Sequence, residues 1–242
     1  MRALALIVSK ELAAYFKGWS GYAICAALLL VDGLLFNLLA LSRGERLSSE
    51  VLMEFFNFTS GVTMIAAILL SMRLFAEERR DGTLVLLTTA PISDWQIAVG
   101  KWLSAFTFLC LFLSTTLYMP LLVMVNGTVG FGQLVAGYIG LALLGGATTA
   151  IGTLASSLTR SQVLAGVLGG AIVTTLVLTW KLANIADPPF DTIFSYTALH
   201  NKHFSPFMRG SVHLRDIVYY ASITFMALLL TQKVLSARRW GS

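Results

Sequence analysis

Residues 102–124 read WLSAFTFLCLFLSTTLYMPLLVM, a stretch without one charged side chain. A helix needs about 20 consecutive apolar residues to cross the hydrocarbon core of a bilayer. Because lipid offers the backbone no hydrogen-bond partners, such a stretch must satisfy its own N–H and C=O groups as a helix. We therefore predict a membrane-spanning helix here, extended on its N-terminal side to residues 99–124.

Five more apolar stretches of similar length surround this one. They predict further spans near residues 20–41, 55–75, 133–157, 162–184 and 214–235. The alternation of apolar and polar residues that marks a membrane β-barrel is absent. The fold class that follows is an all-α integral membrane protein with six transmembrane helices, and residues 1–242 form a single transmembrane domain.

The composition supports lipid as the main solvent of this chain. Hydrophobic residues make up 57% of it and charged residues only 12%, whereas a soluble domain carries about 25% charged residues. The net charge is +5, but the basic residues stand singly or in pairs without interleaved aromatic residues. That pattern argues against nucleic acid as a partner. It indicates instead the excess of Lys and Arg that cytoplasmic loops carry.

Residues 1–18 precede the first span and predict an amphipathic interfacial helix. Apolar side chains recur there at three- and four-residue steps: Leu4, Val8, Leu12, Tyr15 and Trp19. With this end of the chain inside, eleven Lys and Arg residues fall on the inner side and six on the outer side. The sequence therefore predicts that both termini are cytoplasmic.

The inner connection, residues 76–98, is the most organised loop. A dense mixed-charge cluster at residues 77–81 meets a Gly82-Thr83 turn. Ser93 with Gln96 then makes a capping-box pattern that starts the next helix. This helix–turn–helix pattern predicts a docking surface for a cytoplasmic partner, with a solvated connector as the alternative. The long outer connection, residues 185–213, predicts one short amphipathic helix from its apolar spacing at Phe190, Ile193, Phe194 and Leu199.

Sites for bond-breaking chemistry are missing from the sequence. No G-x-x-x-x-G-K-[ST] string exists to cradle nucleotide phosphates, so we expect ATP and Mg²⁺ on another chain and no cofactor on this one. The three histidines, at 200, 203 and 213, have no acidic or cysteine cluster beside them. We therefore predict no metal site. We expect no catalytic residue, since G-x-S-x-G is absent and one ionisable side chain, Asp32, lies deep in a span.

Asp32 has two interpretations at this stage. A lone carboxyl inside the membrane is costly and usually faces a cavity or a partner. We assign it to a translocation path or a subunit contact, with a neutral, hydrogen-bonded packing residue as the alternative. Spans four and five are also rich in glycine, including the Gly166 and Gly170 pair, which favours close helix packing within the subunit or at a subunit interface.

The pattern E-E-R-x-x-G-T-L-x-x-L-x-x-x-P-x-S-x-x-x-I-x-x-G-K, residues 77–101, resembles the ABC-2 type permeases. Within that family, the pattern looks most like the branch involved in gliding motility and nitrous-oxide-reductase maturation. KELAAYF at residues 10–16 is similar to the interfacial start of those subunits. The outer stretch of residues 195–220 resembles their segment before the last helix, at His203-Phe204, Phe207, Arg209-Gly210, Arg215-Asp216 and Tyr219-Tyr220.

This resemblance implies the membrane subunit of an ATP-binding-cassette exporter of the type V kind, in the inner membrane of a bacterium or archaeon. The partners it implies are a cytoplasmic ATPase and a second permease subunit, identical or related. By matching position, the residues that would contact the ATPase are Glu77, Glu78, Arg79, Gly82, Thr83, Pro91, Asp94, Gly100 and Lys101. We assign His203, Phe207 and Arg209 to contacts with an extracytoplasmic accessory protein.

ATP hydrolysis on the ATPase subunit would then drive either the export of a cargo or a conformational signal across the membrane. Two other classes stay open from the residues alone. One is a transporter or channel that works without an ATPase, and the other is a membrane scaffold that transports nothing. The cargo is not named by this pattern.

Overall fold

The structure, a computed structural model, describes residues 2–41, 48–83, 92–126, 130–185, 187 and 190–239. In this part of the chain six helical stretches are long and apolar enough to cross a membrane, and no strand is present. They run over Gly21–Leu38, Ser48–Arg80, Asp94–Val125, Phe131–Leu158, Gln162–Ala183 and Leu214–Arg238. The predicted six-helix, all-α fold is confirmed.

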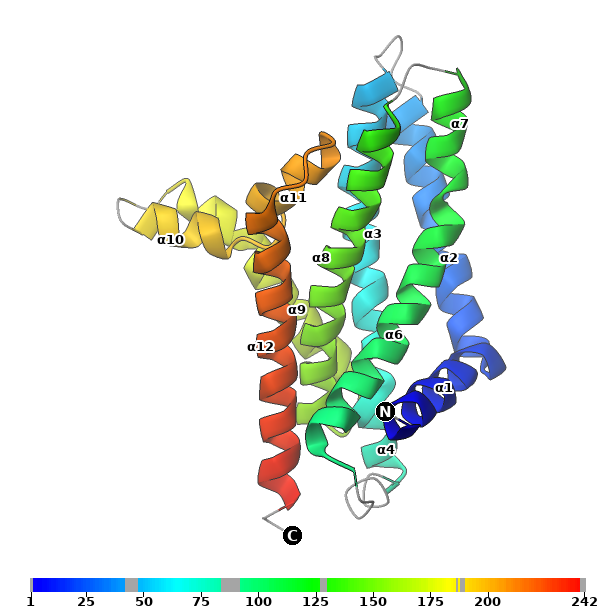
Figure 1. The fold of residues 1–242 in the computed structure, drawn as a ribbon, viewed down its shortest axis with the longest axis vertical. Coiled ribbons are helices and arrows are strands. Elements are labelled where there is room, and N and C mark those ends of the chain that lie inside the picture. The colour runs from blue at the N-terminus through cyan, green and yellow to red at the C-terminus, as the bar shows by residue number, and fades with distance from the viewer. Residues whose placement is uncertain are drawn as a thin grey trace.

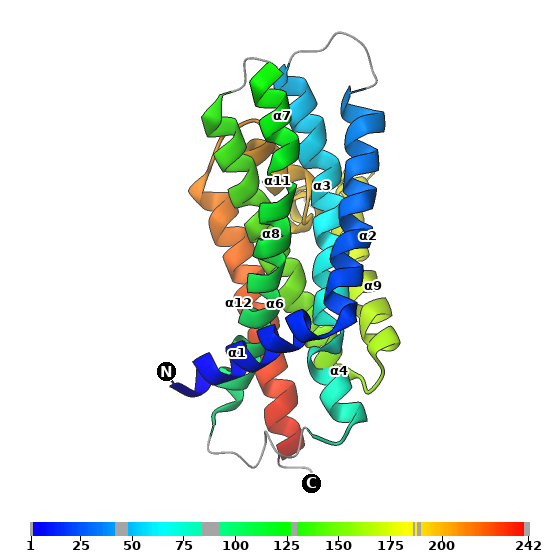
Figure 2. The ribbon, with the colours of Figure 1, turned by 90° about the vertical axis from the view of Figure 1, so that its right-hand side faces the viewer.

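The spans form a long bundle whose two chain ends lie at the same end (Figures 1 and 2). The first span is α2 (Trp19–Leu35), which continues as the wider π-turns of η1 (Phe36–Leu41). Its neighbour α3 (Ser48–Ser71) leads into the short α4 (Arg73–Arg80). The end of the bundle that holds α4 and both chain ends is called here the α4 end.

The third span is divided by a proline. Helix α6 (Asp94–Thr116) gives way after Leu117 to α7 (Tyr118–Asn126). Pro120 lies in the first turn of α7, where it cannot donate a backbone hydrogen bond to Thr116. The predicted capping box at the start of α6 is confirmed, because Ser93 accepts from the Gln96 N–H and Gln96 accepts from the Ser93 N–H.

Helix α8 (Phe131–Leu158) lies at the centre and packs against α3, α6, α9 (Gln162–Ala183) and α12 (Leu214–Arg239). Its glycines make this packing possible. A side chain at Gly137 would collide with the ring of Phe56, and one at Gly140 would meet Phe207 at 2.7 Å. These glycines of span four therefore serve helix packing inside the subunit, one of the two roles that the sequence left open.

Helix α1 (Arg2–Lys17) lies across the bundle near the α4 end (Figure 2). A helix is present over these residues, as predicted, and some of its side chains are buried while others are exposed. Ile7 and Tyr15 are buried, whereas Trp19, the first residue of α2, is 91% exposed. The reason is the sharp change of direction at Gly18, whose extended backbone separates Trp19 from the face of α1.

The connection between the fifth and sixth spans, residues 185–213, holds two helices instead of the single one predicted. Helix α10 (Phe190–Thr197) projects sideways from the bundle, and α11 (Asn201–Met208) packs on α8 (Figure 1). Ala198 and Leu199, which follow α10 in the sequence and precede α11, are both buried. The Leu199 N–H also bonds the Leu176 carbonyl of α9. These anchors end the first helix, which is why Leu199 does not continue the amphipathic face of α10.

Candidate coupling site

Helix α4 begins with a cap that comes from another helix. The helical ladder breaks at Met72, so the first N–H groups of α4 lack intrahelical acceptors. The Ser156 hydroxyl of α8 accepts from the N–H groups of Phe75 and Ala76, at 3.0 Å each. The same hydroxyl donates to the Met72 carbonyl at 2.8 Å. One buried serine therefore fastens the α3–α4 junction to the last turn of α8.

A second attachment joins α4 to the end of α8. The guanidinium of Arg79 donates to the carbonyls of Ser157, at 3.2 Å, and Thr159, at 2.9 Å. These carbonyls lie at the C-terminus of α8, where helical acceptors are free and a positive charge is favourable. Arg79 thus acts as a C-cap for α8 from α4.

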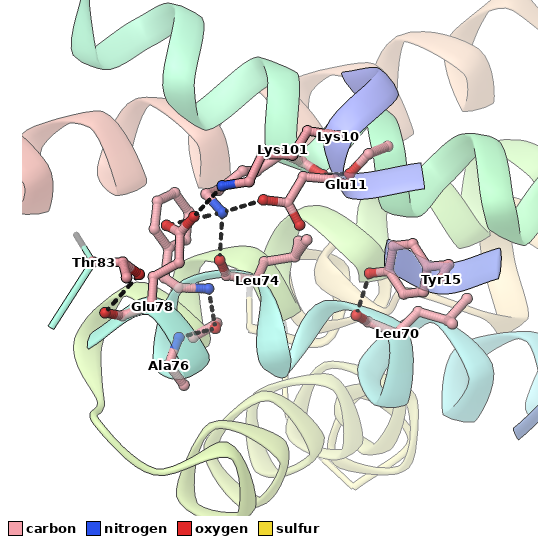
Figure 3. Close-up of polar contacts among 12 residues, drawn as sticks. Lys10, Glu11, Tyr15, Leu70, Leu74, Ala76, Glu78, Thr83 and Lys101 are labelled. Carbon is pink, nitrogen blue, oxygen red and sulfur yellow. Dashed lines mark hydrogen bonds and ion pairs between the residues drawn. The ribbon is translucent and has the colours of Figure 1, made fainter. Parts of the chain in front are cut away.

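Lys101 of α6 is the centre of the polar cluster in Figure 3. Its ammonium group is almost wholly buried and donates to Glu11 Oε1 of α1 and to the Leu74 carbonyl of α4, at 2.7 Å each. Glu78 Oε2 of α4 lies 3.0 Å away as an ion pair, without aligned hydrogen-bond geometry. The ring of Phe75 lies 5.2 Å below. A single cation therefore joins three elements that are far apart in sequence.

The charges of this cluster balance. Glu11 and Glu78 are each 12% exposed, and Lys10 lies 3.7 Å from Glu78 Oε1 with its own side chain 72% exposed. Two carboxylates thus face two ammonium groups, one buried and one in solvent (Figure 3). Buried charges need such pairing, because an unpaired ion away from water costs several kcal/mol.

Tyr15 adds a neutral link between α1 and α3. Its hydroxyl donates to the Leu70 carbonyl at 2.7 Å, and its ring stacks on Phe108 with 4.8 Å between centroids. The Arg73 guanidinium lies 4.0 Å from the centre of the same ring. Burial raises the pKa of Tyr15 above its ordinary value, while Arg73 acts in the opposite direction. The phenol therefore stays neutral and serves as a donor.

The tip that follows α4 faces solvent. Asp81, Gly82 and Thr83 are exposed, and Gly82 adopts φ +73°, which side chains rarely tolerate. The Thr83 hydroxyl closes the turn on the Glu78 carbonyl at 3.4 Å. This exposed turn, together with the charged outer side of α4, is called here the coupling tip (residues 77–83).

The structure divides the predicted contact residues into two groups. Gly82 and Thr83 are exposed on the coupling tip, whereas Glu77 and Arg79 are half-buried there. Glu78 belongs to the same segment but pairs with Lys101 and is only 12% exposed. Asp94 is half-buried in the first turn of α6. Gly100 and Lys101 are buried, and a side chain at Gly100 would lie 3.0 Å from Ile7 of α1. These two therefore hold α6 against its neighbours. Pro91 lies outside the described residues.

Asp32 and the residues predicted to contact an accessory protein lie elsewhere. Asp32 is buried against α3, where the Thr59 hydroxyl donates to Oδ1 at 2.9 Å. His203 and Phe207 are buried, and Arg209 is exposed. The His203 ring stacks on Tyr219 at 3.7 Å, with Nδ1 2.7 Å from Asp216 and Nε2 3.1 Å from the Tyr196 carbonyl. His203 thus fastens α11 to α12 in this arrangement.

Sequence reasoning missed Glu11, Tyr15 and Ser156 as parts of the cluster. Glu11 and Tyr15 stand four apart on one face of α1 with buried Ile7, and that spacing was a usable signal. No local pattern could have singled out Ser156. Among the described residues no group of three or more His, Cys, Asp and Glu could hold a metal ion.

This arrangement defines a polytopic membrane protein with an organised polar site at one end of the bundle. The family model described as ABC-2 family transporter protein matches residues 8–241. The chain therefore belongs to the ABC-2 family, which supplies the membrane component of transporters. No curated protein matches the sequence.

Proposed function

We propose that this chain is a permease subunit whose coupling tip docks on a separate ATP-binding-cassette ATPase. The observation that carries the proposal is the triple attachment of α4. Ser156, Arg79 and Lys101 tie it to α8, α6 and α1. A force applied to the exposed tip therefore acts on several spans together.

The mechanism needs no chemistry in this chain. ATP binding and hydrolysis occur on the partner, which uses its own Mg²⁺, and the coupling tip receives the resulting motion. Such coupling requires two arrangements of the bundle whose balance the ATPase shifts. Export of a cargo or transmission of a conformational signal would follow from the same movement of the spans.

A second permease subunit, identical or related, completes the proposed transporter. A cavity of about 380 Å³ lies between α3 and α9 and is lined by apolar side chains with Gly61 and Gly170. A methyl group at either glycine would meet nothing within 4 Å. This small-residue surface supports close approach of another helix. Arg209 and its exposed neighbours at the opposite end are the surface that we assign to an accessory protein.

The sequence supports two further proposals, one on the orientation in the membrane and one on the branch of the family. The excess of Lys and Arg at the α4 end supports cytoplasmic termini in a bacterial or archaeal inner membrane. The outer residues His203, Phe207 and Arg209, with Tyr219 and Tyr220, support the gliding-motility and nitrous-oxide-reductase-maturation branch.

Gentle solubilisation of the native membrane, followed by capture of the tagged chain, tests the proposal. We expect a stoichiometric partner with a nucleotide-binding P-loop. Replacing the exposed pair with Asp81→Lys and Thr83→Lys should remove that partner while the captured chain stays folded. The matched control, Thr192→Lys and Thr197→Lys on exposed positions of α10, should keep it. Capture of the wild type without any ATPase would contradict the proposed function.

A further inference from the structure

The carboxyl group of Asp32 is unusual in having only one polar partner. Its side chain is wholly buried between α2 and α3. The Thr59 hydroxyl donates to Oδ1 at 2.9 Å, whereas Oδ2 is buried and receives no hydrogen bond from any described residue. A carboxylate normally accepts several hydrogen bonds through its two oxygens. One neutral donor is far fewer than an ion in this position requires.

The contact between Asp32 and Thr59 lies well inside the bundle. Thr59 follows the start of α3 at Ser48 by eleven residues, which is about 16 Å along a helix. Phe36, one turn after Asp32, and Phe55, one turn before Thr59, are both buried, and their rings meet edge to face at 5.8 Å. The Asp32 side chain itself has no solvent-exposed surface in this arrangement.

Among the described residues no Lys, Arg or His forms an ion pair with Asp32. The titratable groups of the packed elements are the Tyr138 phenol of α8, which shares a hydrogen bond with Thr116, and the Tyr118 phenol of α7 beside Gly33. His200 bonds Ser60, the residue after Thr59, and Glu50 and Glu54 lie nearer the outer end of α3.

An isolated carboxylate in such a place takes up a proton, because neutralisation avoids the cost of burying the ion. We propose that Asp32 is a proton-binding site, with the proton on its carboxyl group whenever α2 and α3 are in contact at Thr59. A movement that parts the two helices would let water reach the carboxyl. The O–H bond then breaks, the electron pair stays on the carboxylate, and water accepts the proton.

Infrared spectroscopy of the full chain in lipid nanodiscs at neutral pH tests the binding site. The wild type minus Asp32→Asn difference spectrum should contain the C=O stretching band of a protonated carboxylic acid. Asparagine keeps the oxygen that Thr59 needs, so the fold should be preserved. The spectrum of Glu50→Gln, a change at an exposed carboxyl of α3, should retain the band, so that the band is missing from the wild type minus Glu50→Gln difference spectrum. A difference spectrum with the symmetric and antisymmetric bands of a carboxylate in its stead would overturn the proposal.

The release step rests on the proposed function and is measured separately. Trapping the assembled complex with ATP and vanadate in weakly buffered solution should release about one extra proton per permease subunit relative to Asp32→Asn. The same release from both proteins would disprove the release step while the infrared band still reports the site. If the captured chain has no ATPase, the infrared band of Asp32 should still be present, but ATP and vanadate should trap nothing. That result would show that the proposed function, and not the proton-binding site, is wrong.

Discussion

The ammonium group of Lys101 on α6 donates to the carboxylate of Glu11 on α1 at 2.7 Å, across 90 positions of sequence. This buried contact closes the α4 end of the bundle, since Glu78 of α4 meets the same ammonium at 3.0 Å. The ion pairs of Lys101 with Glu11 and Glu78 are strong because buried charges interact more strongly than charges exposed to water.

Lys101→Met should destabilise the protein by about 3–5 kcal/mol, because it leaves Glu11 and Glu78 buried without their cation. Denaturant unfolding in detergent measures the change. Adding Glu11→Gln and Glu78→Gln to Lys101→Met should recover most of the loss. Lys10→Met, which removes a solvent-exposed ammonium, is the matched control and should cost about 1 kcal/mol or less. Equal losses from the Lys10 and Lys101 changes would contradict the buried cluster.

Ser156→Ala should cost about 1–3 kcal/mol, since it leaves the N–H groups of Phe75 and Ala76 without an acceptor. It should also speed amide hydrogen exchange at the start of α4, which exchange followed by mass spectrometry detects. Ser157→Ala is the control, because the Ser157 hydroxyl bonds only the Leu154 carbonyl of its own helix. Unchanged exchange in α4 after Ser156→Ala would show that the cap contributes nothing.

Gly82→Ala should weaken the coupling tip by about 1–2 kcal/mol, because an L side chain at φ +73° meets its own backbone. Space is not the cause, since nothing lies within 4 Å of the added methyl group. Gly61→Ala has the same open space inside the regular helix α3 and should be neutral or slightly stabilising. A comparison of unfolding midpoints distinguishes strain from crowding, and equal effects of the two changes would argue against strain.

The burial of His200, whose ring contacts Ser60 at 2.6 Å, should make stability depend on pH. Burial lowers the pKa of His200, with the Asn201 side chain acting in the opposite direction. The unfolded chain binds a proton at about pH 6.5 while the folded state resists it, so stability is full above that pH and falls as the pH decreases.

The slope that His200 contributes is at most about 1.4 kcal/mol per pH unit. Unfolding at a series of pH values between about 5 and 8 measures it, and His200→Gln should reduce the slope. His213→Gln, a change at an exposed histidine, should leave it unaltered. A slope that stays the same without His200 would refute this origin.

Much of the fold follows from local sequence, and the site does not. Apolar length predicts the six spans, and Ser93 with Gln96 predicts the start of α6. Lys101, in contrast, looks like a membrane-edge cation until α1 and α4 are placed beside it. Its burial depends on contacts with residues as far away as Glu11, which no local pattern encodes. The direction change at Gly18, which separates Trp19 from α1, likewise has no signature in the apolar spacing of residues 4–19.

Site-specific cross-linking at the coupling tip tests the central claim most directly. A photoreactive residue at Thr83, which is exposed at the α4 end, should cross-link in native membranes to a chain that carries a P-loop. The same residue at Thr197, exposed on α10 between the fifth and sixth spans, should not. Cross-links from Thr83 to lipid or to copies of this chain alone, in membranes where the ATPase is present, would contradict the account.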